Sequence, residues 1–134
     1  MVYKKKFTSY LKTGVLAGVI TTILVNVVFI LMGLIVGHET YFIGQDRDTL
    51  YIVFISFATF MALFLGGIIF YMLQRTTKKP LLWFSIVVLL GFLFNTYTAE
   101  VDLHEQYQLT AHILHVFVGG LAIYLIPKLS REKL

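Results

Sequence analysis

The chain has 134 residues, of which 58% are hydrophobic and only 13% are charged. Soluble globular domains carry about 25% charged residues, so this composition excludes an ordinary soluble domain. The length allows one domain, residues 1–134, and leaves no room for a large catalytic domain beside the apolar segments. Because there is no Cys, disulfides, zinc–thiolate sites, iron–sulfur clusters and thiol catalysis are also excluded.

Four apolar stretches are long enough to cross a bilayer as helices. A hydrocarbon core of about 30 Å requires roughly 20 apolar residues, because the helical backbone finds no water to bond there. The stretches cover about residues 14–36, 50–73, 81–97 and 109–126. Pro80 suits the first turn of the third helix, and Pro127 is expected to end the fourth. The sequence therefore predicts an all-α, four-helix transmembrane bundle with short loops and up-down topology.

The charged residues indicate how the bundle is oriented. Ten of the eleven basic residues lie before the first stretch, between the second and third, or after the fourth: Lys4, Lys5, Lys6, Lys12, Arg75, Lys78, Lys79, Lys128, Arg131 and Lys133. Arg47 and most of the acidic residues lie in the other two loops: Glu39, Asp46, Asp48, Glu100, Asp102 and Glu105. Basic short loops remain in the cytoplasm, so we expect both termini to be cytoplasmic, in a bacterial plasma membrane. Topology accounts for the net charge of +4, and no nucleic-acid partner is expected.

Glycine pairs mark surfaces for close helix packing. Gly14 and Gly18 form one GxxxG pattern, and Gly33 and Gly37 form another in the same stretch. In lipid, helices attract one another mainly through van der Waals contact, and glycine lets two backbones approach closely. We interpret these glycines as packing sites within the bundle. The alternative is an interface with a second copy or another membrane protein.

The fourth stretch carries the most informative polar residues. No Asp, Glu, Lys or Arg lies in the core of any stretch, whereas histidine does. If the fourth helix begins near residue 103, a turn of about 100° per residue places His104, Gln108, His112, His115 and Gly119 on one stripe. Such a stripe is expected to face the bundle interior or a wet cavity, because polar groups are costly in lipid.

Polar residues on the other helices fall at similar depths. Asn95 and Thr96 lie near the outer end of the third stretch, and Ser56 and Thr59 lie in the outer half of the second. Asn26 lies near mid-membrane. Together with the stripe, they predict a polar vestibule that opens outward and is closed below by apolar side chains.

Three interpretations of the vestibule remain open. The histidines could hydrogen-bond neighbouring helices and fix their register, which is a purely structural role. They could instead bind a small molecule or a metal ion, with His104, His112, His115 and Glu105 as the metal ligands. Finally, they could respond to protons, because imidazole titrates near neutral pH.

Two segments resemble a family of small four-helix bacterial membrane proteins known only as a domain of unknown function. They are LGGIIFYMLQRTTKKPLLW and LTAHILHVFVGGLAIYLIP, and with the loop between them the resemblance covers about residues 58–127. The resemblance implies a four-helix integral membrane domain and points to His115, or else His112, as its characteristic polar position. It implies no activity.

The sequence contains no nucleophile–base pair, phosphate-binding loop or paired carboxylates at a useful spacing, so we expect no enzymatic activity and no cofactor. The leading interpretation is a small structural or accessory membrane protein that acts in the lipid bilayer, alone, as a homo-oligomer or with a membrane-protein partner. The alternative is a binder, sensor or transporter of a small molecule or metal ion that uses the histidine-lined vestibule.

Overall fold

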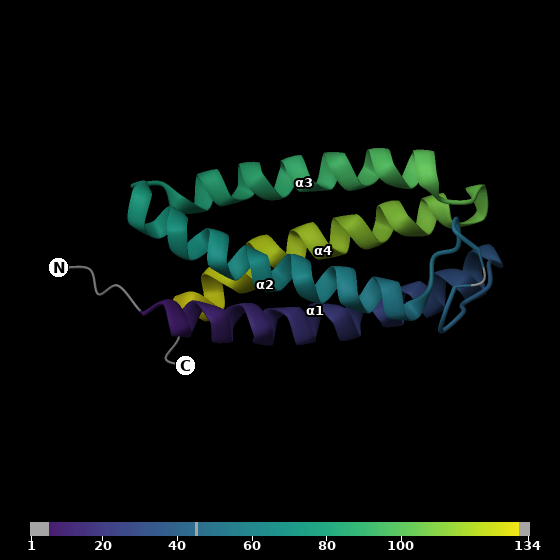
Figure 1. Cartoon of the computed structure of the whole chain (residues 1–134), viewed down its shortest axis with the longest axis horizontal. Helices are drawn as coiled ribbons and strands as arrows, with labels where there is room; N and C mark the ends of the chain where they lie inside the picture. The colour runs from purple at the N-terminus through teal and green to yellow at the C-terminus, as the bar shows by residue number, and fades with distance from the viewer. Residues whose placement is uncertain (1–5, 45, 132–134) are drawn as a thin grey trace.

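The computed structural model describes residues 6–44 and 46–131, which fold into four α-helices and no strand (Figure 1). Helix α1 spans Phe7–Val36, α2 spans Ile52–Thr76, α3 spans Pro80–Asp102 and α4 spans Glu105–Arg131. Each of these four helices is long and apolar enough to cross a membrane. The predicted all-α class is confirmed, and the architecture fits a small multi-pass membrane protein. Lys4, Lys5 and Lys133, on which the predicted orientation partly depends, lie outside the described residues.

The helices extend beyond the apolar stretches that predicted them. Helix α1 begins at Phe7 rather than near Gly14, and α3 continues past Tyr97 to Asp102. Hydropathy marks only the part of a helix that lies in hydrocarbon, whereas backbone hydrogen bonding continues into the headgroup region. Proline does begin α3, where its missing N–H removes no helical bond.

Helix α4 does not end at Pro127 as expected but continues to Arg131. Proline removes one backbone hydrogen bond from a helix interior, which membrane helices tolerate when neighbouring groups compensate. The carbonyl left without its N–H donor is that of Ile123, four residues before Pro127. Beyond the proline, Ile126 and Leu129 are buried, and the Ser130 hydroxyl donates to the Ile126 carbonyl oxygen at 2.5 Å within the last turn. The last turn therefore stays helical because it packs against the bundle.

Glycines bring α1 and α2 into close contact. A Cβ atom added at Gly14 would lie 3.0 Å from the Phe64 carbonyl oxygen, and one at Gly18 would lie 2.9 Å from the Phe60 ring. Both positions face α2, so this GxxxG pattern packs within the bundle. The second pattern ends α1: Gly37 has φ 94°, and its N–H donates to the Gly33 carbonyl oxygen at 2.8 Å. Glycine adopts this left-handed conformation without strain.

Helix α3 is the least enclosed element. Among the described residues it contacts α4 and α2 but not α1, and only Phe84 and Ala99 are buried on it. Figure 1 shows α3 along the edge of the bundle opposite α1. The start of α1, the α2–α3 turn and the end of α4 lie at one end of the bundle, and the other two loops lie at the opposite end (Figure 1). We call these the basic end and the acidic end.

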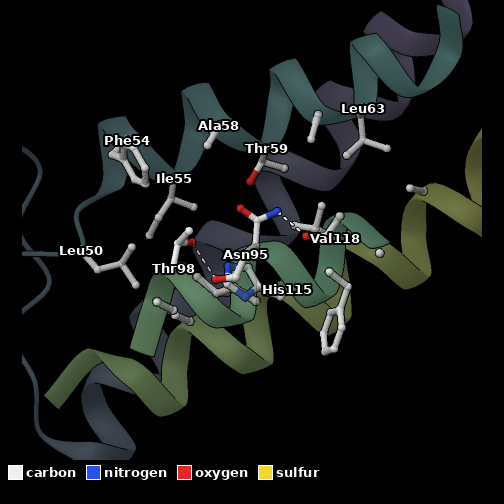
Figure 2. Close-up of a pocket in the computed structure, with 18 of the residues that line it drawn as sticks. Leu50, Phe54, Ile55, Ala58, Thr59, Leu63, Asn95, Thr98, His115 and Val118 are labelled. Atoms are coloured by element: carbon white, nitrogen blue, oxygen red, sulfur yellow. Dashed lines mark hydrogen bonds between the residues drawn. The ribbon is translucent and has the colours of Figure 1, made fainter. Parts of the chain in front are cut away.

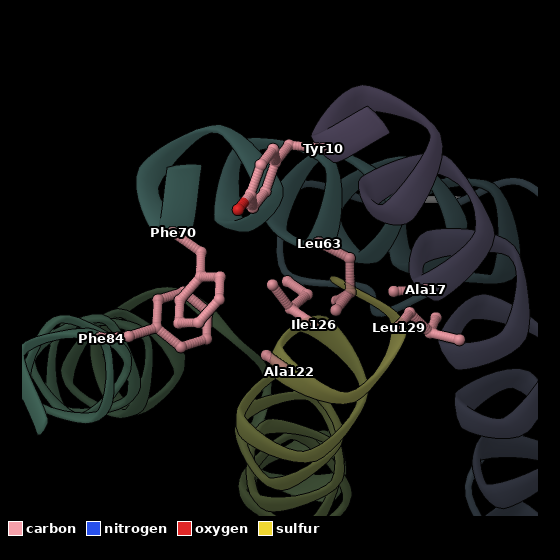
Figure 3. Close-up of a cluster of buried hydrophobic side chains, with 8 residues drawn as sticks. All are labelled: Tyr10, Ala17, Leu63, Phe70, Phe84, Ala122, Ile126 and Leu129. Atoms are coloured by element: carbon pink, nitrogen blue, oxygen red, sulfur yellow. The ribbon is translucent and has the colours of Figure 1, made fainter. Parts of the chain in front are cut away.

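Two buried clusters hold the helices together. The cluster near the basic end is shown in Figure 3 and consists of Tyr10, Ala17, Leu63, Phe70, Phe84, Ala122, Ile126 and Leu129. The cluster near the acidic end consists of Val25, Phe29, Leu50, Ile55, Ala99, Tyr107, Ala111 and Leu114. Many large apolar side chains remain exposed on the outer faces of the helices, as expected for surfaces that contact lipid.

Candidate functional site

A cavity of about 570 Å³ lies between α2, α3 and α4 (Figure 2). Its walls are mostly aliphatic and aromatic side chains, and it reaches from the loop before α2 to the first turns of α3. Pockets that bind small molecules typically have volumes of about 300–1,000 Å³ and apolar walls with a few polar groups. The size and lining of this cavity therefore match those of a small-molecule site.

The cavity is open along a slot between α2 and α3. Small residues line the slot: Ala58 and Ala62 on α2, and Gly91 on α3. These residues and the neighbouring Val87 and Asn95 are exposed although they line the cavity. With no bulky side chain to bridge them, the two helices leave an opening that would face lipid in a bilayer.

Three polar side chains from three helices lie at a similar level of this cavity: Thr59 on α2, Asn95 on α3 and His115 on α4. We call them the polar belt. In Figure 2 the Thr59 hydroxyl and the Asn95 amide point toward the same open space, with His115 nearby. The side-chain amide nitrogen of Asn95 donates to the backbone carbonyl oxygen of Gly91 at 2.8 Å. The side-chain carbonyl oxygen of Asn95 therefore remains available to a ligand.

The His115 ring has few partners of its own. Its Nδ1 atom is buried without a hydrogen-bond partner among the described residues. The ring lies edge-to-face against Phe92, with centroids 6.5 Å apart. An unpaired buried polar atom costs free energy, so a ligand that hydrogen-bonds to the belt would recover part of that cost.

Charged residues line the cavity only at the acidic end. Arg47 comes from the loop before α2, and Asp102 is the last residue of α3. Among the described residues, neither takes part in an ion pair. At the other end the cavity closes on Phe84, whose ring packs edge-to-face against Phe70 with centroids 5.3 Å apart. The cavity thus has a charged mouth and an apolar floor.

His112 lies outside this cavity although it belongs to the predicted stripe. Its Nε2–H donates to the Glu100 Oε1 atom at 2.5 Å, which joins α4 to α3. Gln108 makes a similar link, because its amide donates to the carbonyl oxygens of Glu100 at 3.4 Å and Leu103 at 3.3 Å. Both residues fasten α3 to α4.

His38 is buried and fully bonded. Its Nδ1 lies 3.0 Å from the Glu39 carbonyl oxygen, which can only accept, so the neutral ring carries its proton on Nδ1. The Thr110 hydroxyl then donates to Nε2 at 2.8 Å. The ring also stacks on Phe29 and packs against Tyr107. His38 therefore joins the first loop to α1 and α4.

The proposed metal ligands are not gathered around one point. In the described residues, no group of three or more His, Cys, Asp or Glu side chains is arranged to hold an ion. His104 precedes α4, where its Nδ1 accepts the Gln106 N–H at 3.2 Å. Its own backbone N–H donates to the Asp48 carbonyl oxygen at 3.0 Å, which ties the two acidic loops together. Glu105, the first residue of α4, is exposed.

Asn26 and Ser56 meet each other away from the cavity. The Asn26 amide donates to the Ser56 hydroxyl at 2.9 Å, and to the Thr22 carbonyl oxygen at 2.9 Å. This contact joins α1 to α2, and neither residue lines the cavity. Of the predicted vestibule residues, Thr59, Asn95 and His115 line the same cavity.

Sequence reasoning missed several cavity residues. Arg47 and Asp102 were used only to orient the bundle, although Arg47 is the one basic residue in the acidic loops. The small residues Ala58, Ala62 and Gly91 gave a weak signal, because small residues are common in membrane helices. Their pairing across α2 and α3 depends on tertiary structure.

Comparison with known proteins places the chain in a family. No curated protein and no solved structure matches it. The resemblance to an uncharacterised family is confirmed by a match over residues 7–132, which is nearly the whole chain. The chain belongs to DUF6069, a family of unknown function.

Proposed function

We propose that this chain is a non-enzymatic binding protein of the bacterial plasma membrane that holds a small, largely apolar molecule between α2, α3 and α4. The observation that carries the proposal is the cavity of about 570 Å³ with Thr59, Asn95 and His115 converging on it from three helices. In this proposal the helices form an up-down bundle with both termini in the cytoplasm, so the charged mouth faces outward.

The surroundings of the cavity favour binding over transport. A transporter must open its site alternately to both sides of the membrane. Here the cavity closes on Phe84, which belongs to a buried cluster with Phe70 and Ile126. Opening the cavity toward the cytoplasm would require this cluster to come apart. We therefore propose a site that a ligand enters and leaves from the outer half of the membrane.

The polar belt supports an organic ligand rather than a metal ion. A zinc or copper ion requires three or four nitrogen, sulfur or oxygen ligands around one point. The belt offers a hydroxyl, an amide and one imidazole, which are groups that orient an organic molecule through hydrogen bonds.

A structural or accessory role is the second candidate. It is supported by side-chain hydrogen bonds that join helices, Asn26 with Ser56 and His112 with Glu100, and by the bond of His38 in the first loop to Thr110 on α4. Such contacts fix the relative positions of membrane helices. In this alternative the exposed outer face of α3 would pack against a second copy or another membrane protein, and the cavity would hold only lipid.

Native mass spectrometry of the gently solubilised full chain tests the proposal. We expect a bound molecule of defined mass in the wild type and its loss in Ala62→Trp, because an indole at this slot position obstructs the slot and the part of the cavity beside it. The matched control is Leu90→Trp, which places the same side chain on an exposed α3 position that does not line the cavity. An adduct pattern that is identical in all three proteins would refute the binding function and favour the accessory role.

A further inference from the structure

Building on the proposed binding function, we infer that the occupant is a single-chain zwitterionic amphiphile, such as a lysophospholipid. It enters sideways from the lipid through the slot between α2 and α3. Its hydrocarbon chain lies along the cavity, and its headgroup lies between Arg47 and Asp102. Four features of the cavity support this ligand class: its shape, its opening, the lipid around it and the charges at its mouth.

The cavity is long. Its lining on α3 runs from Phe84 to Asp102, which at a rise of about 1.5 Å per residue is a length of roughly 27 Å. An extended hydrocarbon chain can lie along this length with its polar end at the charged mouth.

The slot allows such a chain to enter without passing through water. Ala58 and Ala62 lie about one helical turn apart on α2, and Gly91 lines the slot from α3. A lipid chain beside α2 and α3 could slide between them. A folded or multi-ring molecule would require the two helices to separate.

The lipid environment makes polar contacts decisive for selectivity. A hydrocarbon chain that leaves the bilayer for an apolar cavity gains little from the hydrophobic effect, because lipid tails are as apolar as the cavity wall. Preference for one lipid over the bulk must therefore come from the groups that do not face hydrocarbon. In this cavity those groups are the polar belt and, at the mouth, Arg47 and Asp102.

The mouth offers one charge of each sign. Arg47 would bind a phosphate through two parallel hydrogen bonds, and Asp102 would accept a hydrogen bond from, or attract, an ammonium group. An anionic ligand would be attracted by Arg47 but repelled by Asp102. A cationic ligand would be attracted by Asp102 but repelled by Arg47. A zwitterionic headgroup satisfies both, and both residues lack an ion-pair partner among the described residues.

Four probes with the same oleoyl or oleyl chain test this inference: lysophosphatidylcholine, oleate, oleylamine and oleyl alcohol. Binding to the purified full chain is followed by native mass spectrometry as each probe is titrated. We expect lysophosphatidylcholine to bind best. Arg47→Gln and Asp102→Asn are each expected to weaken its binding about tenfold, which is typical of losing a charge-assisted hydrogen bond, while leaving oleyl alcohol unchanged.

Two further variants separate the possible failures. Asp46→Asn changes a charge at the same end of the bundle but outside the cavity, so it should leave all four probes unaffected. Ala62→Trp should abolish binding of every probe. If the four probes bind equally to the wild type and only Ala62→Trp reduces binding, the zwitterion inference is overturned while the binding function stands. If oleate or oleylamine binds best, the inference is likewise overturned. If Ala62→Trp changes nothing, the binding function itself fails.

Discussion

Replacing Gly67 with alanine should destabilise the bundle by forcing α1 and α2 apart. A Cβ atom at this position would lie 2.8 Å from the Tyr10 carbonyl oxygen and 3.1 Å from the Gly14 Cα atom. Both are backbone atoms of α1, so no side-chain rotation can relieve the contact. The close approach of the two helices therefore depends on glycine at this position.

The magnitude follows from two opposing effects. An ordinary van der Waals contact of a Cβ atom lies at 3.4–4 Å, so the helices must separate locally by about 0.6 Å or more. Overpacking of this kind costs about 1–3 kcal/mol. Alanine regains up to about 1 kcal/mol because it favours a helix more than glycine does. We expect a net loss of about 1–2 kcal/mol in the free energy of unfolding.

Equilibrium unfolding by SDS in mixed detergent micelles would measure this loss. Gly120→Ala is the matched control, because a Cβ atom there meets nothing within 4 Å. This variant should keep or raise the stability, by up to about 1 kcal/mol. If Gly67→Ala is as stable as Gly120→Ala, the two helices are not packed through their glycines, and the reasoning is refuted.

Three further predictions concern side-chain hydrogen bonds that join elements of the bundle. Thr110→Val should lower the free energy of unfolding by about 1–3 kcal/mol, because it leaves Nε2 of the buried His38 without a donor; an unchanged value in the same SDS assay would contradict this. Glu100→Gln should lower the free energy of unfolding by only about 0.2–1 kcal/mol, because the contact of Glu100 with His112 is partly exposed. Cysteine cross-linking between the outer ends of α3 and α4 should show a looser contact in this variant, and an unaltered cross-linking rate would count against the link. Asn26→Leu should cost about 0.6 kcal/mol, the average for such membrane hydrogen bonds, and a gain in stability would show that its bonds to α1 and α2 contribute nothing.

The sequence was sufficient to predict the four helices because membrane insertion imposes a simple rule. Hydrocarbon leaves the backbone no bonding partner except itself, so length and hydropathy alone locate the spans. The helix ends were less predictable. Whether α4 stops at Pro127 depends on how Leu129 and Ser130 pack, which is a property of the folded bundle.

The candidate site was partly predictable from helical periodicity. The predicted stripe on α4 includes His115, which lines the cavity. Residues three apart still differ by about 60° around a helix. This angle is enough to direct His112 to Glu100 on α3 while His115 faces the cavity. The pattern identified a polar side of the helix but could not say which neighbour each histidine meets.

The opening between α2 and α3 could not be foreseen from the sequence. It arises because α3 packs on α4 more than on α2, and this choice depends on side-chain fit over many positions. One example is Gly119, where a Cβ atom would lie 3.4 Å from the Val88 side chain. Small residues on α4 allow α3 to pack closely against α4, and the space between α3 and α2 remains open.

The short links at both ends of α3 limit how this opening can change. Thr77, Lys78 and Lys79 join α3 to α2, and only Leu103 and His104 join it to α4. Because both of its ends are held by short links, α3 cannot pivot away from the bundle about one end. It can only bow or rotate about its axis, which are collective motions on the microsecond-to-millisecond scale. An occupant wider than the slot would exchange with the membrane no faster than this helix moves, so its residence time would be set by the tethers as well as by its contacts.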